Sequence, residues 1–150
     1  MASDYLLELD GIKGESTDKK HKDSIDIEAF SWGCSNPVRL STSGGGGAGK
    51  VSFRDIAFTK QTDKSSPHLM LRCCNGQHIK KAVLYVRKQG GEQQEYHKVT
   101  LEDVLVSSFQ ASGAGGEVPS ESFSLNFSKI ELAYDYVTGD GSVRTERAGW

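Results

Sequence analysis

An alternation of apolar and polar residues that repeatedly slips by one position most limits what this chain can fold into. A period of two residues is typical of β-strands with one buried face. In the segment 25–34 the apolar parity changes between Ile27 and Phe30. Such a slip indicates either a β-bulge or a break between two strands. It recurs in the segments 51–58 and 123–136.

Repeated bulges predict the overall architecture. They bend long strands, and repeated bends close a sheet into a barrel. We therefore predict a mainly β chain: a β-barrel of two packed antiparallel sheets with bulged long strands and one short helix. We expect residues 1–150 to form a single domain, with an extended loop at about 39–50.

The one helix is predicted at about 67–75. Ser66 is a favoured N-cap, and Pro67 suits the first helical position because its missing N–H would have no partner there. Gly76, after Asn75, predicts the end of the helix. The face expected to pack on the sheet consists of Leu69, Met70, Cys73 and Cys74.

A glycine-rich run from Gly44 to Lys50 is spelled almost like a phosphate-binding loop. That loop needs a hydroxyl residue after the lysine and must open a helix. Val51 offers no hydroxyl for Mg²⁺, and the β-branched and aromatic residues after it predict a strand. We therefore set aside a nucleotide-binding enzyme and interpret residues 39–50 as a long surface loop.

No other pattern points to catalysis, a cofactor or a metal. Cys34, Cys73 and Cys74 are an odd number, so they form no disulfide framework. Adjacent cysteines on a helix point about 100° apart and cannot easily share a metal ion. The sequence contains no HExxH motif and no Gly-x-Ser-x-Gly elbow. We expect a protein that is not an enzyme and needs no cofactor.

The net charge of the chain and its first residues indicate which partners it can bind and where in the cell it folds. The net charge is −2 and the basic residues are scattered, which argues against nucleic acid as a partner. The apolar stretches are too short to insert in a membrane. The N-terminus lacks the basic region and the apolar core of a signal peptide. We expect the chain to fold in the cytoplasm and to leave, if it does, without a cleaved signal.

The edges of the predicted sheets bear on assembly. Long strands leave open edges unless the barrel closes fully, and open edges are templates for pairing with another chain. This favours self-assembly. The alternative is a monomeric β-barrel interaction module that binds a single protein partner. The residue pattern leaves both open.

A series of short motifs, each weak alone, occurs in the order and spacing of a known family. They are YLLELDGIKGES at 5–16, IDI at 25–27, FSWG at 30–33, the glycine run at 44–50, FTK at 58–60, DKSSP at 63–67, LML at 69–71, RKQGG at 87–91, LVSS at 105–108 and LNF at 125–127. The series resembles the haemolysin-coregulated protein family, the tube subunits of bacterial type VI secretion systems.

The resemblance implies a six-membered ring with a wide central channel. It also implies that rings stack into a tube like that of a phage tail, which a contractile sheath ejects. The implied partners are further copies of the chain, effector proteins carried and chaperoned in the channel, and the spike, sheath and baseplate components. A protein of this kind starts in the bacterial cytoplasm and is secreted into the medium or a target cell.

Particular residues also acquire expected roles. The resemblance places Ser31 on the channel wall, in contact with cargo. The local alternation agrees in part, because Ser31 faces outward if Phe30 and Trp32 face the core. Residues 147–150 resemble the start of the family's closing strand, and members often continue beyond it, so we expect that strand to be incomplete.

The long loop has an expected role of its own. It is too long and too rich in glycine for a simple hairpin turn, so we expect it to contact the next ring or the next subunit and to order there. The residues concerned are Thr42, Ser43, Gly44, Gly45, Gly46, Gly47, Ala48 and Gly49.

Overall fold

The structure is a computed structural model that describes residues 3–37, 50–88 and 94–150. It confirms a mainly β fold with one short helix. In chain order the elements are β1 (Ser3–Leu9), β2 (Ile25–Ile27), β3 (Ala29–Ser31), β4 (Cys34–Ser35), β5 (Ser52–Phe53), β6 (Ile56–Gln61), α1 (Ser66–Asn75), β7 (Ile79–Lys88), β8 (Glu95–Ser112), β9 (Ser120–Val137) and β10 (Val143–Gly149).

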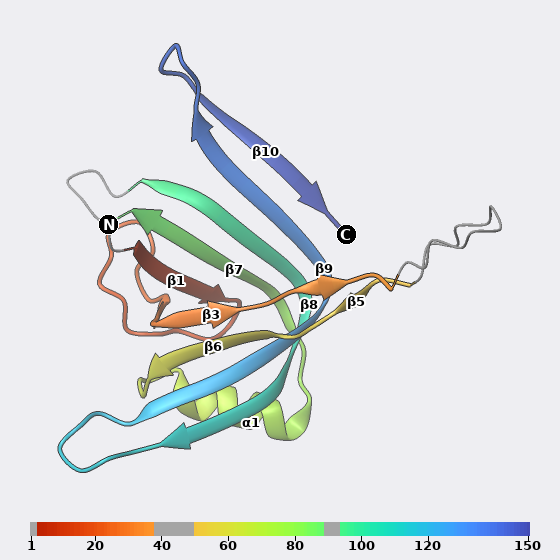
Figure 1. Ribbon diagram of the computed structural model, residues 1–150. Helices are drawn as coiled ribbons and strands as arrows, with labels where there is room; N and C mark the ends of the chain where they lie inside the picture. The colour runs from red at the N-terminus through yellow and green to blue at the C-terminus, as the bar shows by residue number, and fades with distance from the viewer. Residues whose placement is uncertain (1–2, 38–49, 89–93) are drawn as a thin grey trace.

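One sheet supplies both walls of the fold (Figure 1). Its eight strands run in the order β2-β1-β7-β8-β9-β6-β3, with β10 paired to β9, while β4 and β5 form a separate two-stranded sheet. The ends of the large sheet meet, because β2 and β3 follow one another in the chain with only Glu28 between them. The Glu28 N–H donates to the carbonyl of Thr59 on β6 at 2.8 Å.

The sheet folds over along a line across β7, β8 and β9, which we call the crease. Each strand exposes two consecutive residues there, and Lys81, Glu102 and Lys129 are neighbours in register. Residues that face the core therefore change parity together on all three strands. The exposed pairs are Lys80 and Lys81, Glu102 and Asp103, and Ser128 and Lys129; the core-facing residues that flank them are Ile79 and Ala82, Leu101 and Val104, and Phe127 and Ile130.

Asp103 lies at the centre of the crease with a φ of 53°, in the left-handed region that few L-residues adopt. Aspartate tolerates this conformation because its short polar side chain bonds locally. The Asp103 carboxylate accepts a hydrogen bond from Ser128 Oγ (2.9 Å) and contacts His78 Nδ1 (2.5 Å). The hydrogen bonds from His78 and Ser128 hold the pKa of the Asp103 carboxyl below its ordinary value.

The three slips in the sequence pattern have two origins. Between Ile27 and Phe30 the chain stops pairing with β1 and starts pairing with β6, so the slip is a break between strands. A break also separates β5 from β6. The slip at 127–130 is different, since β9 continues through it and the crease accounts for it. A further register shift lies between Val106 and Ser108 of β8, beyond the slips that the sequence predicted.

The core fills the space between the two walls. Phe58 of β6 stacks on Phe123 of β9 with ring centroids 5.1 Å apart. Tyr5 of β1 meets Phe30 of β3 edge to face, also at 5.1 Å, where the ends of the sheet come together. The largest fully buried apolar side chains are Leu7, Ile25, Ile56, Phe58, Leu69, Ile79, Leu84, Val99, Leu101, Phe123 and Leu125.

The helix α1 confirms the predicted helix to within one residue. Gly76 ends it with a φ of 67°, and the Gly76 N–H donates to the carbonyl of Arg72 (3.0 Å). The prediction of Ser66 as the N-cap is wrong by one residue, because Ser65 holds that position. Among the described residues no helix is long and apolar enough to cross a bilayer.

The apolar face predicted for α1 is only partly correct. Leu69 is fully buried, and Cys73 packs partly against the core. Met70 is 47% exposed and Cys74 is exposed, so these two face outward. The short helix covers the sheet along a narrow stripe, which leaves its remaining apolar residues at the surface.

Ser66 is drawn away from capping by a buried charged network at the start of α1. Lys60 of β6 is 0% exposed, and its ammonium donates to Glu121 Oε1 (2.6 Å), Asp63 Oδ1 (2.9 Å) and Ser66 Oγ (2.9 Å). The Ser66 hydroxyl in turn donates to the same Glu121 oxygen at 2.7 Å. The network ties β6, β9 and the first turn of α1 together. Burying these charges costs desolvation free energy, and the hydrogen bonds and ion pairs offset that cost only while every charged group keeps its partners.

Removing one partner of this network should therefore destabilise the protein strongly. We expect Lys60→Met to lower the free energy of unfolding by about 3–5 kcal/mol, because it leaves the Glu121 carboxylate buried without a counter-charge. Adding Glu121→Leu should recover much of the loss, since an apolar pair of similar volume is often neutral. Urea unfolding at fixed protein concentration measures both. A Lys60→Met variant whose free energy of unfolding lies within about 1 kcal/mol of wild type would show that the network has no such role.

Candidate functional site

The outer surface of β3, β6, β9 and β8 carries uncharged and mostly small residues in two rows across the sheet. Alternate residues of the same strands, such as Phe30, Phe58 and Phe123, pack into the core. We call this surface the hydroxyl face. Its rows are Ser31, Ala57, Ser124 and Ser108, followed by Ala29, Thr59, Ser122 and Gln110.

Ser31 lies at the end of β3 in the first of these rows, opposite Ala57. It is exposed, while its neighbours Phe30 and Trp32 pack against the core. This is the geometry that the strand alternation predicted for Ser31. A contact of Ser31 with cargo stays a prediction.

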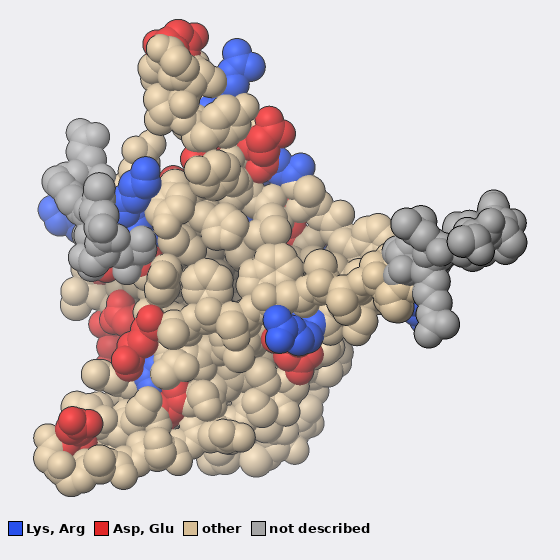
Figure 2. Space-filling model, in the orientation of Figure 1, with Lys and Arg blue, Asp and Glu red and all other residues tan. Residues whose placement is uncertain are grey.

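Serine hydroxyls bond to one another across β8 and β9 on the hydroxyl face. Ser124 Oγ lies 2.7 Å from Ser107 Oγ and 2.5 Å from Ser108 Oγ, at the register shift in β8. Each hydroxyl can donate one hydrogen bond and accept two, without a fixed charge. Figure 2 shows the side of the molecule that carries β3 and β6, with few charged side chains over its centre and more toward its margins. Such a surface can contact varied protein chains without selecting one sign of charge.

The second notable surface is the hairpin of β9 and β10, which extends away from the rest of the sheet (Figure 1). All seven residues of β10 are exposed. Apolar side chains on the hairpin are exposed as well: Tyr134 is 50%, Val143 is 53% and Val137 is 62% exposed. β8 pairs with β9 only as far as Tyr134, so beyond that residue the hairpin is a two-stranded ribbon, which is marginally stable at best. It therefore depends on cross-strand contacts or on a further partner.

Cross-strand side-chain contacts pin the register of the hairpin. Thr145 Oγ1 donates to Asp135 Oδ1 (2.6 Å), and the Tyr136 hydroxyl donates to Glu146 Oε1 (3.2 Å). These contacts are exposed and contribute little each. They orient β10 but do not replace a buried face.

The outer edge of β10 has no hydrogen-bonded neighbour in the described parts of the chain. Ile130 and Trp150 exchange both backbone hydrogen bonds, at 3.1 and 2.8 Å. Bonded and non-bonded pairs alternate along an antiparallel ladder. The N–H groups of Thr145 and Arg147 therefore point away from β9, toward the open edge.

The remaining sequence predictions can be placed as follows. The loop residues Thr42 to Gly49 lie outside the described residues. The segment after Lys50 begins the strand β5, as predicted, and not a helix. The expected closing strand at 147–150 falls within and just after β10. Among the described residues no group of three or more His, Cys, Asp or Glu side chains is arranged to hold a metal ion.

Sequence reasoning missed three features of these surfaces. The free edge of β10 was missed because the strand has no alternating apolar pattern; its residues from Arg144 to Arg147 are polar on both faces. That lack of alternation is itself the available signal. The buried Lys60 had no signal of its own, since its partner Glu121 is distant in the chain. The crease left a slip in the alternation at 127–130, but one strand alone does not distinguish it from a bulge or a break.

Comparison with known proteins shows which proteins this chain resembles. Residues 6–134 match the family model described as type VI secretion system effector, Hcp. The chain is 46% identical to protein hcp1 of Pseudomonas aeruginosa strain PAO1 over 144 residues. The aligned region covers 95% of this chain and 89% of that protein. A solved structure of a type six secretion system protein superposes with a TM-score of 0.89 at 30% identity, covering 99% of this chain and 95% of that chain. Hcp1 from Salmonella typhimurium gives 0.78 at 32% identity, covering 100% and 94%.

These matches place the chain in a class of proteins, the type VI secretion proteins built on an antiparallel sheet that folds over on itself. The chain belongs to the Hcp family of the type VI secretion system.

Proposed function

We propose that this chain is the tube subunit of a type VI secretion machine, that six copies close into a ring, and that rings stack into a tube. The observation that carries this proposal is β10, a strand exposed on all seven residues with one edge free. A neighbouring copy that adds a strand to this edge would bond its N–H and C=O groups. A head-to-tail contact of this type generates a closed ring when its rotation closes.

The hydroxyl face is the best candidate for the channel wall. It lies on β3, β6, β8 and β9, away from the free edge of β10, so it stays open when that edge is paired. Its residues are uncharged and, apart from Gln110, small, which leaves room for an effector protein. We propose that effectors are held against this face and chaperoned there. The family is not a known enzyme family, and we infer a structural and carrying role without catalysis.

Two further parts of the proposal rest on family membership. The loop residues Thr42 to Gly49 are proposed to contact the next ring of the stack. The spike, sheath and baseplate components are proposed as machine partners, with secretion from the bacterial cytoplasm as the outcome. A monomeric module with a single partner remains the alternative, and the mass of the protein in solution separates the two.

Light scattering on the purified chain should give a mass near six times 16.3 kDa. We expect Thr145→Pro to shift the mass toward the monomer, because proline removes an N–H from the free edge and leaves the β9 ladder intact. Thr145→Ala is the matched control, since it also loses the Asp135 hydrogen bond but keeps the N–H. A wild-type monomer at micromolar concentration rejects the ring. Equal masses for both variants reject pairing through this edge.

The cargo site is tested at Ser31. Ser31→Gln adds bulk to the hydroxyl face without touching the core, so folding and ring mass should not change. Retention of a co-expressed cognate effector should fall, because a crowded contact loses its shape fit. Co-purified effector and its half-life in cells are measured. Thr17→Gln, at an exposed hydroxyl residue outside the hydroxyl face, is the control. If both variants retain effector as wild type does, Ser31 is not part of the cargo site.

A further inference from the structure

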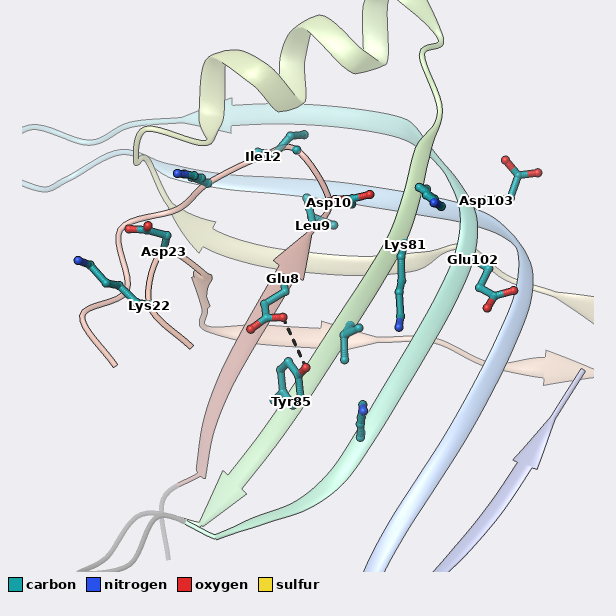
Figure 3. A pocket seen from close by; sticks show the side chains of 15 residues that line it. Glu8, Leu9, Asp10, Ile12, Lys22, Asp23, Lys81, Tyr85, Glu102 and Asp103 are labelled. Carbon is teal, nitrogen blue, oxygen red and sulfur yellow. Dashed lines mark hydrogen bonds between the residues drawn. The ribbon is translucent and has the colours of Figure 1, made fainter. Parts of the chain in front are cut away.

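A groove of about 970 Å³ lies on the outer surface of β1, β7 and β8, the wall across the core from the hydroxyl face. Val83 and Tyr85 of β7 line it from the sheet. On one side it is lined by residues 10–13, Lys22 and Asp23, and on the other by the crease. Figure 3 shows Lys22 and Asp23 on the first side, Lys81 and Glu102 on the second, and Glu8 and Tyr85 between them.

Charged contacts hold the segment 10–24 on the sheet, so the groove is preformed. The His21 ring stacks on Tyr85 with centroids 4.0 Å apart and joins Glu8 (2.7 Å) to Glu95 through its two nitrogens. Burial lowers the pKa of His21, but hydrogen bonds to the two carboxylates outweigh it and raise the pKa overall. Burial, with Glu8 and Glu95, raises the pKa of Tyr85 to about 12, so its phenol stays protonated.

A second anchor and a close backbone contact fix the same segment. Arg87, only 3% exposed, donates to Asp18 Oδ1 at 2.7 Å. Gly14 lies so close to the chain at the start of β2 that a Cβ atom there would meet the carbonyl oxygen of Ser24 at 2.4 Å and Cα of Ile25 at 2.7 Å. The wall of the groove therefore has little freedom to move when a ligand arrives.

The charges around the groove are unevenly satisfied. Four of the five carboxylates that line it already have a cationic or histidine partner: Glu8 with His21, Asp23 with Lys64, Glu102 with Lys129, and Asp103 with His78. Within the described parts of the chain none of the lining lysines forms an ion pair; these are Lys13, Lys22, Lys80, Lys81 and Lys98. The fifth carboxylate is Asp10. The groove thus presents five ammonium groups that are free of ion pairs, although the chain as a whole is negative.

We propose that this lysine groove docks an acidic segment of a partner protein. The lysines lie on both of its sides, so carboxylates spaced along one segment can reach ammonium groups in turn. The partly exposed ring of Tyr85 offers an apolar surface for the side chains between those carboxylates. Electrostatic complementarity of this kind sets partner choice and speeds association.

A protein segment fits the groove better than nucleic acid does. The paired carboxylates, such as Glu102 and Asp103, remain as local negative charges among the lysines. They would repel a continuous row of phosphates, whereas a protein segment can place neutral or basic residues against them. The proposal does not require the ring, because it rests on the fold of one chain.

The test uses the full chain and a fluorescein-labelled peptide of alternating glutamate and serine, with binding followed by fluorescence anisotropy. A lysine–serine peptide and a single-stranded DNA oligonucleotide are the comparison probes. We expect the acidic peptide to bind more tightly than either, and more weakly as salt rises. The double variant Lys81→Glu/Lys98→Glu should weaken its binding at least about tenfold.

The matched control is Lys19→Glu/Lys20→Glu, which changes the net charge equally at exposed residues that do not line the groove. It should bind the acidic peptide as wild type does, and the melting temperatures of both variants should match that of wild type. An equal loss in the control would overturn the proposal in favour of a general charge effect. Absent binding of the acidic peptide, or tighter binding of the oligonucleotide, would also overturn it.

Discussion

A sheet with strands of 18 residues, as in β8 and β9, can enclose a core only if it folds over on itself. The crease is where this happens, because three adjacent strands expose two consecutive residues at the same level. Beyond it the opposite set of side chains faces inward, and Leu84 and Phe58 can meet in one core. Asp103, with its positive φ and its contacts to His78 and Ser128, occupies the point where the three strands bend.

Because the sheet folds over on itself, the molecule has two different outer surfaces and one free strand edge, that of β10. One wall carries the small, uncharged residues around Ser31, and the other carries the lysine groove. Because β9 is long, β6 pairs with its first part and β10 with its last part, on the same side. The sheet, whose two ends meet at Glu28, therefore leaves β10 outside the region that encloses the core. The free edge is a consequence of strand length, and a second copy of the chain is the partner we propose for it.

Much of this could be predicted from the sequence, for local reasons. Alternation fixes which face of a strand is buried, so the outward direction of Ser31 followed from Phe30 and Trp32. Proline and glycine punctuation placed α1, although the N-cap shifted by one residue because Glu121, distant in the chain, recruits the Ser66 hydroxyl. The origin of each pattern slip could not be predicted, since bulge, break and crease leave the same mark on one strand. The lysine groove depends on which carboxylates already have partners, and only the fold decides that.

The central claim is that the free edge of β10 is completed by a neighbouring copy. Hydrogen–deuterium exchange tests it most directly, at the amides of Thr145 and Arg147, in concentrated protein and in protein diluted until the light-scattering mass falls to that of one chain. The account predicts that these amides are protected in the assembly and exchange freely in the monomer, while the Trp150 amide, bonded within the hairpin, changes less. Fast exchange of Thr145 and Arg147 in the intact assembly would contradict it.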